Sequence, residues 1–294
     1  MKSRGKLKQE WKPTYPLKGL TTFGIGGEAE YFFAPENTAR LAEALRQAKK
    51  CGLRVFILGA GSNILIAASK LRGLVIKLSA PYFKKIYLKR QSLYAGAGIS
   101  LAGVLRFAWK KSLSGFEFSA GIPGTVGGAL TMNAGIPGKC IFDLLEAVRV
   151  MDYNGKTKTI KKDKIKFAYR KSGLDKYIIL SAKFKLRPGK KEEIQQVVKQ
   201  YLESRRTSQD GKSFSAGCVF KNPRPDLTAG ELIDLSGLKG RRRGGAQVSP
   251  LHANFIVNRA NAKAGDVLAL MKLASGRVKN KFGIKLEPEI KIWQ

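Results

Sequence analysis

Hydrophobic residues recur at two spacings along this chain, and together they predict a mixture of helices and strands. Leu41, Leu45 and Ala48 repeat at helical intervals after Asn37, a residue type that caps helix N-termini. Residues 53–58 (LRVFIL) are rich in β-branched and apolar side chains, which favours a strand. The alternation of such segments predicts an α+β fold.

The same patterns extend through the rest of the chain. Helices are expected at 101–111, 192–203, 229–235 and 264–282. Strands are expected within 20–36, at 73–78, 92–95, 177–186 and 254–257, near Ile290, and as a hairpin from 146–153 through Asn154-Gly155. A Pro-Gly break near 188–190 predicts a domain boundary. We therefore expect a basic N-terminal extension (1–19), a region at 20–188 with subdomains of about 20–80 and 81–188, and a smaller α+β domain at 189–294.

Glycine is concentrated in one stretch, residues 115–138 (GFEFSAGIPGTVGGALTMNAGIPG), where it supplies seven of 24 positions. A flexible linker is the alternative, but linkers are polar and this stretch interleaves large apolar side chains. Glycine permits close backbone approach, and successive amide groups form concave anion sites. The stretch therefore predicts a buried loop system that holds a ligand such as a pyrophosphate.

Composition removes several classes of function. The cysteines at 51, 140 and 218 form no C-x-x-C pair, which suggests a reducing cytoplasm, and with a single histidine no metal site is expected. No apolar run approaches the roughly 18–20 residues of a membrane span. No apolar segment follows the basic N-terminus, so a secretory signal is not expected. We therefore predict a cytoplasmic protein without a membrane partner.

The net charge of +34 raises the alternative of a nucleic-acid binder. Residues 156–191 carry 14 Lys and Arg against Asp163 and Asp175, and Arg241–Arg243 adds a second cluster. No RNA-recognition, zinc-finger or leucine-zipper pattern accompanies them. Steering of phosphorylated small molecules, or a generally basic proteome, explains the charge equally well, so no nucleic-acid partner is expected.

The familiar nucleotide motifs are absent. A G-x-G-x-x-A match at 24–29 lacks a preceding strand, and Gly59-Ala60-Gly61 has Ile64 where a third glycine would stand. No G-x-x-x-x-G-K-[ST] loop is present. The loop after the strand at 53–58 is nevertheless suited to phosphates. Its amide groups would surround the phosphates, and the Ser62 and Asn63 side chains would add hydrogen bonds to them.

Seven short motifs in a fixed order resemble those of the UDP-N-acetylenolpyruvoylglucosamine reductase (UDP-N-acetylmuramate dehydrogenase) family. Each motif alone is a weak signal, but seven motifs in this order are specific. The resemblance covers nearly all of the chain from Leu20 to Trp293. The motifs are TFGIGG (22–27), GAGSN (59–63), AGIPGTVGGA (120–129), FAYR (167–170), AGCVFKNP (216–223), GGAQVS (244–249) and LEPE (286–289).

The resemblance implies a two-part FAD-binding region of the vanillyl-alcohol-oxidase type and a smaller C-terminal substrate domain, in the shorter, type II form of the enzyme. It implies NADPH-dependent reduction of the enolpyruvyl group of a UDP-linked amino sugar to UDP-N-acetylmuramate, during peptidoglycan precursor synthesis. A monomer is expected. FAD would be held non-covalently by Gly59, Ala60, Gly61, Ser62, Asn63, Gly121, Ile122, Gly124, Thr125, Gly127 and Gly128.

The resemblance also assigns the chemistry to three residues. Arg170 would bind the substrate carboxylate through a bidentate fork, and Glu289 would assist there while sharing a proton. Cys218 would donate the proton to C2, where many relatives carry serine. Substrate contacts are expected from Tyr169, Arg170, Lys221, Asn222, Gln247 and His252.

Alternatives for these residues remain open. An unperturbed thiol, with a pKa near 8.5, is protonated at neutral pH, but nearby cations such as Lys221 would favour a thiolate that cannot donate a proton. Cys218 would otherwise be a buried structural cysteine, or pair with His252 as in a thiol hydrolase. Another flavin oxidase is a further alternative, although such enzymes often attach flavin through a histidine, and the one histidine lies outside the FAD region.

Overall fold

The computed structural model describes residues 10–209 and 213–294, and the chain divides into two compact units. The first unit comprises residues up to Thr14, Glu30–Ala60 and Arg72–Glu203. The second comprises Tyr15–Ala29, Gly61–Leu71 and Ser204–Gln294. The chain therefore passes between the units several times. Among the described residues, every helix is too short or too polar to cross a membrane.

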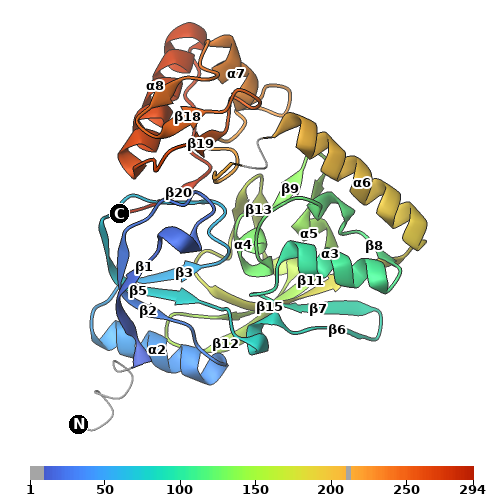
Figure 1. Cartoon of the computed structure of the whole chain (residues 1–294). Helices are drawn as coiled ribbons and strands as arrows, with labels where there is room; N and C mark the ends of the chain where they lie inside the picture. The colour runs from blue at the N-terminus through green and yellow to red at the C-terminus, as the bar shows by residue number, and fades with distance from the viewer. Residues whose placement is uncertain (1–9, 210–212) are drawn as a thin grey trace. The chain divides into compact units, whose positions relative to one another are not determined.

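The first unit is built on a five-stranded antiparallel sheet with the order β12-β11-β15-β7-β6. Its α4 packs against β15 and β7, and α3, α4 and α5 gather beside the sheet (Figure 1). The elements are β6 (Ile86–Lys89), β7 (Ser92–Gly96), α3 (Leu101–Lys110), α4 (Val126–Thr131), α5 (Ile141–Leu144), β11 (Leu145–Met151), β12 (Thr157–Lys161) and β15 (Ile178–Lys185).

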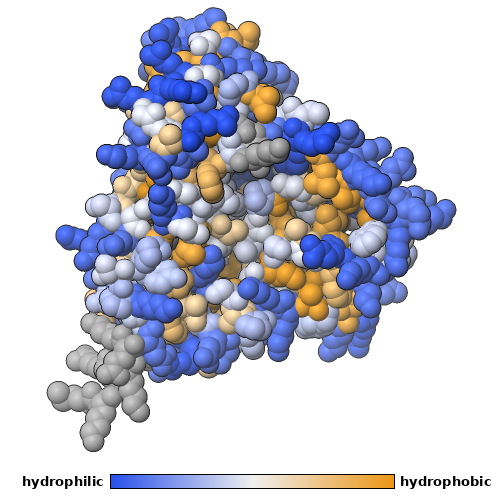
Figure 2. Space-filling view, viewed as in Figure 1, coloured by the Kyte–Doolittle hydropathy of each residue, from blue (hydrophilic) through white to orange (hydrophobic). Residues whose placement is uncertain are grey.

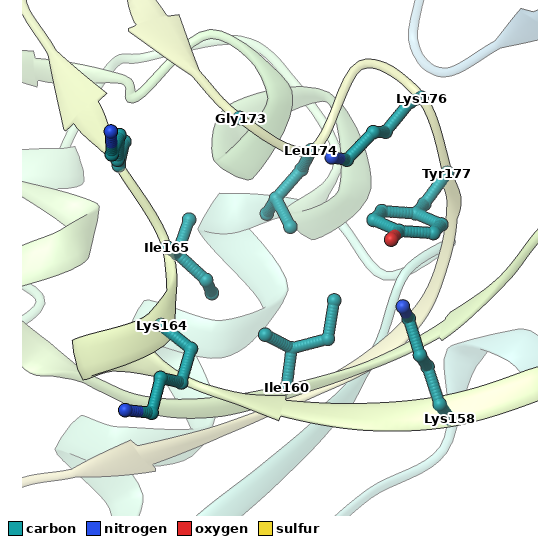
Figure 3. A pocket seen from close by; sticks show the side chains of 9 residues that line it. Lys158, Ile160, Lys164, Ile165, Gly173, Leu174, Lys176 and Tyr177 are labelled. Atoms are coloured by element: carbon teal, nitrogen blue, oxygen red, sulfur yellow. The ribbon is translucent and has the colours of Figure 1, made fainter.

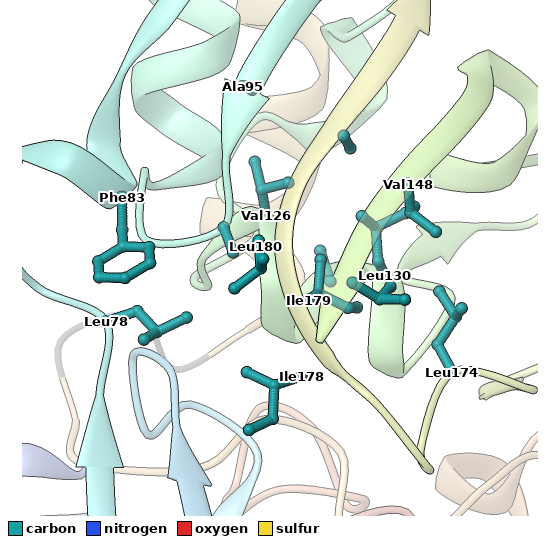
Figure 4. Packing of buried hydrophobic residues seen from close by; sticks show 14 of the residues in the cluster. Leu78, Phe83, Ala95, Val126, Leu130, Val148, Leu174, Ile178, Ile179 and Leu180 are labelled. Atoms are coloured by element: carbon teal, nitrogen blue, oxygen red, sulfur yellow. The ribbon is translucent and has the colours of Figure 1, made fainter. Parts of the chain in front are cut away.

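The core of the first unit lies between this sheet and α4. Val148 of β11 is fully buried, and its register partner on β15 is Ala182. Val126 and Leu130 of α4 point toward the side chains of β15, among them Leu180 (Figure 4). This packing fixes the loop before α4, which is the glycine-rich stretch singled out by its sequence.

A four-stranded sheet has the order β1-β2-β5-β3, with β3 and β5 parallel. The strands are β1 (Lys12–Pro16), β2 (Glu28–Phe33), β3 (Val55–Leu58) and β5 (Lys70–Lys77). Helix α2 (Thr38–Lys50) follows β2 and buries Leu41, Ala44, Leu45 and Ala48. Asn37 caps it, because its side chain accepts hydrogen bonds from the N–H groups of Ala39 and Arg40.

The second unit has a core of its own around α8 (Ala264–Phe282). Helix α7 (Ala229–Leu235) packs against α8, which in turn packs on a three-stranded antiparallel sheet of β17 (Arg242–Arg243), β18 (Ala246–Val248) and β19 (Ile256–Asn258). Strand β20 (Lys291–Trp293) pairs in parallel with β4 (Ile64–Ile66). Helix α8 ends at Gly283, whose φ of 72° lies in the left-handed region that glycine adopts readily.

The remaining elements are short, apart from α6 (Lys191–Ser208), whose surface is mainly hydrophilic on the face seen in Figure 2. Short strands pair as β8 (Leu113–Ser114) with β16 (Arg187–Pro188), β9 (Gly135–Ile136) with β10 (Lys139–Cys140), and β13 (Phe167–Ala168) with β14 (Lys171–Ser172). The 3-10 helices are η1 (Lys18–Leu20), η2 (Pro81–Lys84), η3 (Glu117–Ser119) and η4 (Lys162–Lys164).

The predicted α+β class is confirmed, and most predicted elements are present. The helix expected at 192–203 is longer, since α6 continues to Ser208. The N-terminal extension contains a strand, β1, flanked by buried Trp11 and Leu17. The boundary expected near 188–190 stays a prediction; the second unit resumes at Ser204, inside α6.

Replacement of Asn37 tests whether its side chain stabilises the N-terminus of α2. We expect Asn37→Ala to lower the free energy of unfolding by about 1 kcal/mol, because two amide groups lose their acceptor. Asn37→Asp keeps an acceptor oxygen and should unfold close to wild type. Urea denaturation followed by circular dichroism measures both, and equal stability of Asn37→Ala and wild type would contradict this role.

Candidate cofactor and substrate sites

Two glycine-containing segments of the first unit, the start of the loop at 59–63 and the loop at 121–128, meet at Thr125. Gly59 follows β3, and a Cβ placed on it would lie 2.9 Å from the Thr125 Oγ1 atom. The Thr125 hydroxyl accepts a hydrogen bond from the Gly128 N–H group at 3.3 Å, which caps α4. The close approach favours glycine at position 59, and it joins two motifs that are more than 60 residues apart in the sequence.

The loop at 121–128 is anchored at several points and still presents exposed backbone. Gly121 and Gly124 have φ values of 73° and 156°. The Gly127 N–H group donates to the Ala97 carbonyl at 2.9 Å, and the Gly124 carbonyl accepts from Leu101 at 3.0 Å. Gly121 is exposed, as is Gly128 beside Thr125. A rigid main-chain surface without covering side chains fits a cofactor that is held through backbone contacts.

The rest of the first loop, from Gly61 to Asn63, belongs to the second unit. Gly61 has a φ of 69°, and a Cβ on it would lie 2.2 Å from the Leu20 carbonyl oxygen. The Asn63 side-chain amide donates to the Glu289 carbonyl at 3.2 Å. The Asn63 carbonyl accepts from the Lys291 N–H group at 2.9 Å. Asn63 thus holds the main chain beside Glu289, and its predicted phosphate contact stays a prediction.

Arg170 lies in the turn of the β13–β14 hairpin, with a φ of 54°. Its Nη1 atom donates to the Gly135 carbonyl at 3.2 Å, and the centre of its guanidinium lies 5.0 Å from the centroid of the Tyr169 ring. The Ser172 hydroxyl donates to the Thr131 carbonyl at 3.0 Å, which ties the hairpin to the end of α4. The predicted carboxylate binder and the glycine loop therefore share one supporting helix.

Asn133 is a residue of this site that the sequence analysis missed. Its Nδ2 atom donates to the Ala168 carbonyl of the hairpin at 3.0 Å. Asn133 is 6% exposed with a φ of 44°, and its buried Oδ1 atom has no hydrogen-bond partner among the described residues. Asparagine tolerates the left-handed region, but the sequence alone gives no sign that position 133 adopts it.

Cys218 and Glu289 lie on paired segments of the second unit. The Glu289 N–H group donates to the Val219 carbonyl at 2.8 Å, and Phe220 forms a β-bridge with Pro288. Cys218 itself bridges Phe255. This backbone pairing brings the two predicted residues close together. Both are half-buried, so part of each side chain is accessible.

The predicted substrate contacts of the second unit are held in place by neighbouring groups. The Lys221 ammonium lies 3.2 Å from the Glu287 carboxylate, and the Asn222 Oδ1 atom accepts from the Ala229 N–H group at 3.2 Å. Gln247 is buried, and its Nε2 atom donates a hydrogen bond to the Gly240 carbonyl at 3.0 Å.

Arg259 is a second residue that the sequence analysis missed. Its Nε atom donates to the Gln247 Oε1 atom at 3.2 Å, and its Nη1 atom donates to the Ser213 hydroxyl at 2.9 Å. Arg259 is exposed, whereas Gln247 is buried. Gln247 thus orients an exposed guanidinium of the same unit. Arginine is frequent on a basic chain, so no sequence signal separates this one from the others.

His252 has a defined environment in the second unit. Its Nδ1 atom accepts a hydrogen bond from the Asn254 N–H group at 3.2 Å, and its ring lies 4.7 Å from the ring of Phe255 between centroids. Burial lowers the pKa of His252 below its ordinary value, and the charge of Lys239 lowers it further. The imidazole is therefore neutral at pH 7 and acts by hydrogen bonding.

Two family models match the chain. One, described as FAD binding domain, matches residues 29–161, which contain both glycine loops. The other, described as UDP-N-acetylenolpyruvoylglucosamine reductase, C-terminal domain, matches residues 209–293, which contain Cys218 and Glu289. The predicted FAD-binding region with a following C-terminal domain is confirmed by these matches.

Relatives match almost the whole chain. A UDP-N-acetylenolpyruvoylglucosamine reductase of Heliobacterium modesticaldum is 40% identical, over 96% of this chain and 90% of its own length. One of Moorella thermoacetica is 40% identical, over 98% of this chain and 94% of its own. The crystal structure of UDP-N-acetylenolpyruvylglucosamine reductase from Thermus caldophilus matches with a TM-score of 0.82 and 37% identity, covering 95% of this chain and 97% of that one. The chain belongs to the UDP-N-acetylenolpyruvoylglucosamine reductase family.

Proposed function

We propose that this protein is an FAD-dependent oxidoreductase that uses NADPH to reduce the enolpyruvyl group of UDP-N-acetylglucosamine enolpyruvate. The product is UDP-N-acetylmuramate, a precursor of peptidoglycan. The observation that carries the proposal is a 40% identity to reductases of this name over 96% of the chain. The meeting of the two glycine loops at Thr125, inside the region matched as FAD binding domain, agrees with it.

FAD is held without a covalent bond by the loops 59–63 and 121–128. The Thr125 side chain leaves little space for a Cβ at Gly59, and the loops expose the backbone of Gly121 and Gly128, which suits a cofactor with a pyrophosphate and a flat ring. His252, the one histidine of the sequence, lies outside the matched FAD-binding residues. Bound FAD supplies hydride transfer from NADPH to the enolpyruvyl double bond.

Arg170 binds the carboxylate of the enolpyruvyl group. Hydride addition moves negative charge toward that carboxylate, and a guanidinium that donates two parallel hydrogen bonds stabilises the charge as it develops. The Gly135 carbonyl and the Tyr169 ring orient Arg170 before substrate arrives. Such preorganisation avoids the cost of moving a charged side chain during the reaction.

Cys218 donates the proton to C2 of the enolpyruvyl group from its Sγ atom. A cysteine thiol is a much stronger acid than a serine hydroxyl, and at its ordinary pKa near 8.5 it is mostly protonated at neutral pH. Glu289 lies on the segment paired with residues 218–220, and it stabilises the carboxylate side of the substrate by sharing a proton.

The remaining contacts of the second unit bind the UDP part of the substrate. Lys221 offers a point charge to the diphosphate, and Asn222 and the neutral His252 offer hydrogen bonds to the sugar. Gln247 contributes by holding Arg259, whose guanidinium is a further partner for phosphate oxygens. The enzyme acts in the cytoplasm as a monomer and has no nucleic-acid partner.

An assay that follows both co-substrates tests the proposal. NADPH should be consumed only when the UDP-linked enolpyruvyl sugar is present. Mass spectrometry should find a product heavier by the hydride and the proton that the sugar has gained. Oxidation of NADPH that depends on oxygen and leaves the sugar unchanged would assign the protein to another class of flavoenzyme.

Substitution of Cys218 tests its role as the proton donor. We expect Cys218→Ala to lower kcat by about 10²–10⁴-fold, because a general acid contributes this much, while Cys218→Ser keeps substantial activity. The FAD content of both variants should equal that of wild type, which separates loss of the proton from loss of the cofactor. Full activity of Cys218→Ala would remove the thiol from the mechanism.

Substitution of Arg170 tests charge stabilisation in the first unit. Arg170→Ala should lower kcat by about 10²–10³-fold, the usual effect of losing one donor to a developing anion. The matched control is Lys171→Ala, which removes one exposed positive charge from the next position. If the two variants lose activity equally, the general charge of the hairpin and not the position of Arg170 is responsible.

A further inference from the structure

A pocket of about 540 Å³ lies in the first unit, at the base of the β13–β14 hairpin (Figure 3). It is bounded by β12, by η4, and by the segments that enter and leave the hairpin. Its volume falls in the range of small-molecule sites. The lining residues are Lys158, Ile160, Lys164, Ile165, Lys166, Gly173, Leu174, Lys176 and Tyr177. Four of these are lysines and none carries a carboxylate.

The positive charge of this pocket is organised around Tyr177. The ammonium groups of Lys158 and Lys176 lie 4.6 Å and 5.6 Å from the centroid of its ring, and Figure 3 shows the two lysines on either side of it. Interaction with Lys158 lowers the pKa of the Tyr177 hydroxyl, and the charge of Lys176 lowers it further. Two cations gathered at one ring repel each other, and an anion between them would remove that cost.

The floor of the pocket is apolar. Ile165 and Leu174 are buried, and Ile160 of β12 is half-buried (Figure 3). The four lysines around it are exposed, so the floor offers an apolar contact surface while the ammonium groups remain accessible to a ligand. Lys164, one of the lysines that line the pocket, forms an ion pair with Asp163 at 3.9 Å. Both side chains are mostly exposed.

We propose that this pocket binds a small polyphosphate anion, either inorganic or the phosphate chain of a nucleotide. Lysine ammonium groups recognise phosphate oxygens as point charges without a fixed geometry. Several lysines around one apolar floor suit a ligand that carries several negative charges. A ligand with a single carboxylate would neutralise only one of them. The Tyr177 hydroxyl adds a donor at the centre of the group.

The position of the pocket gives the ligand access to the hairpin that carries Arg170. Lys166 and Gly173 close the base of that hairpin, since the Gly173 N–H group donates to the Lys166 carbonyl at 2.8 Å. Both residues line the pocket, one on each arm. An anion bound there contacts the two arms together and lowers their freedom to separate.

The test is isothermal titration of the FAD-loaded protein with tripolyphosphate at about 0.15 M salt, where the Debye length is about 8 Å and diffuse attraction is screened. Saturating uridine diphosphate keeps the proposed substrate site filled. The variant Lys158→Gln/Lys176→Gln should weaken binding about tenfold or more, because it removes two charged hydrogen-bond donors. Lys158→Arg/Lys176→Arg keeps the charge and should bind within a few-fold of wild type.

The matched control is Lys89→Gln/Lys199→Gln, which removes the same charge from two exposed positions of the first unit. Lys89 belongs to β6, at the opposite edge of the sheet from β12. This control should bind tripolyphosphate as wild type does. Equal weakening in the two glutamine variants would overturn the proposal, because it would show attraction by the overall charge of +34.

Two further readouts complete the test. Hydrogen exchange of residues 165–174 should slow when tripolyphosphate binds to wild type, and stay unchanged in Lys158→Gln/Lys176→Gln. A nucleoside triphosphate that binds more tightly than tripolyphosphate assigns the site to nucleotides, and equal affinity assigns it to the phosphate chain alone; both support the proposal. Absence of binding to wild type by either ligand contradicts it, whatever the reductase assay shows.

Discussion

The site of the first unit depends on one close contact, that between the backbone at Gly59 and the side chain of Thr125. A Cβ at position 59 would approach the Thr125 hydroxyl to 2.9 Å, so a larger residue there would displace the side chain that caps α4. Thr125 in turn caps α4, whose buried face packs on β15 and β7. The hairpin of Arg170 is tied to the same helix through Ser172 and Thr131. The loop at 121–128 and Arg170 are therefore positioned by one packed helix.

The second unit uses backbone pairing for the same purpose. Residues 218–220 pair with Phe255 on one side and with residues 288–289 on the other, so backbone pairing positions both Cys218 and Glu289. Asn63 adds a third attachment through the Glu289 carbonyl. The side chains of Cys218 and Glu289 are half-buried, so both remain partly accessible.

Much of this could be predicted from the sequence because the signals are local. Asn37 caps α2 as its position suggested, and the glycine spacing at 121–128 indicated a backbone surface before α4. Strand β1 was missed because Pro13 and Pro16 argue against a strand; both are accommodated because β1 is an edge strand of its sheet. Asn133 and Arg259 were missed because their partners are distant in sequence, at Ala168 and Gln247. Such pairings follow from tertiary packing, which no local pattern encodes.

The central claim is that one flavin site first accepts hydride from NADPH and then delivers it to the enolpyruvyl sugar. The most direct measurement is an absorption spectrum of the FAD-loaded protein without oxygen, recorded after NADPH and again after the UDP-linked enolpyruvyl sugar. The account predicts that NADPH bleaches the flavin band and that the sugar restores it. A band that recovers only when oxygen is admitted, or a protein that binds no FAD on reconstitution, would contradict the account.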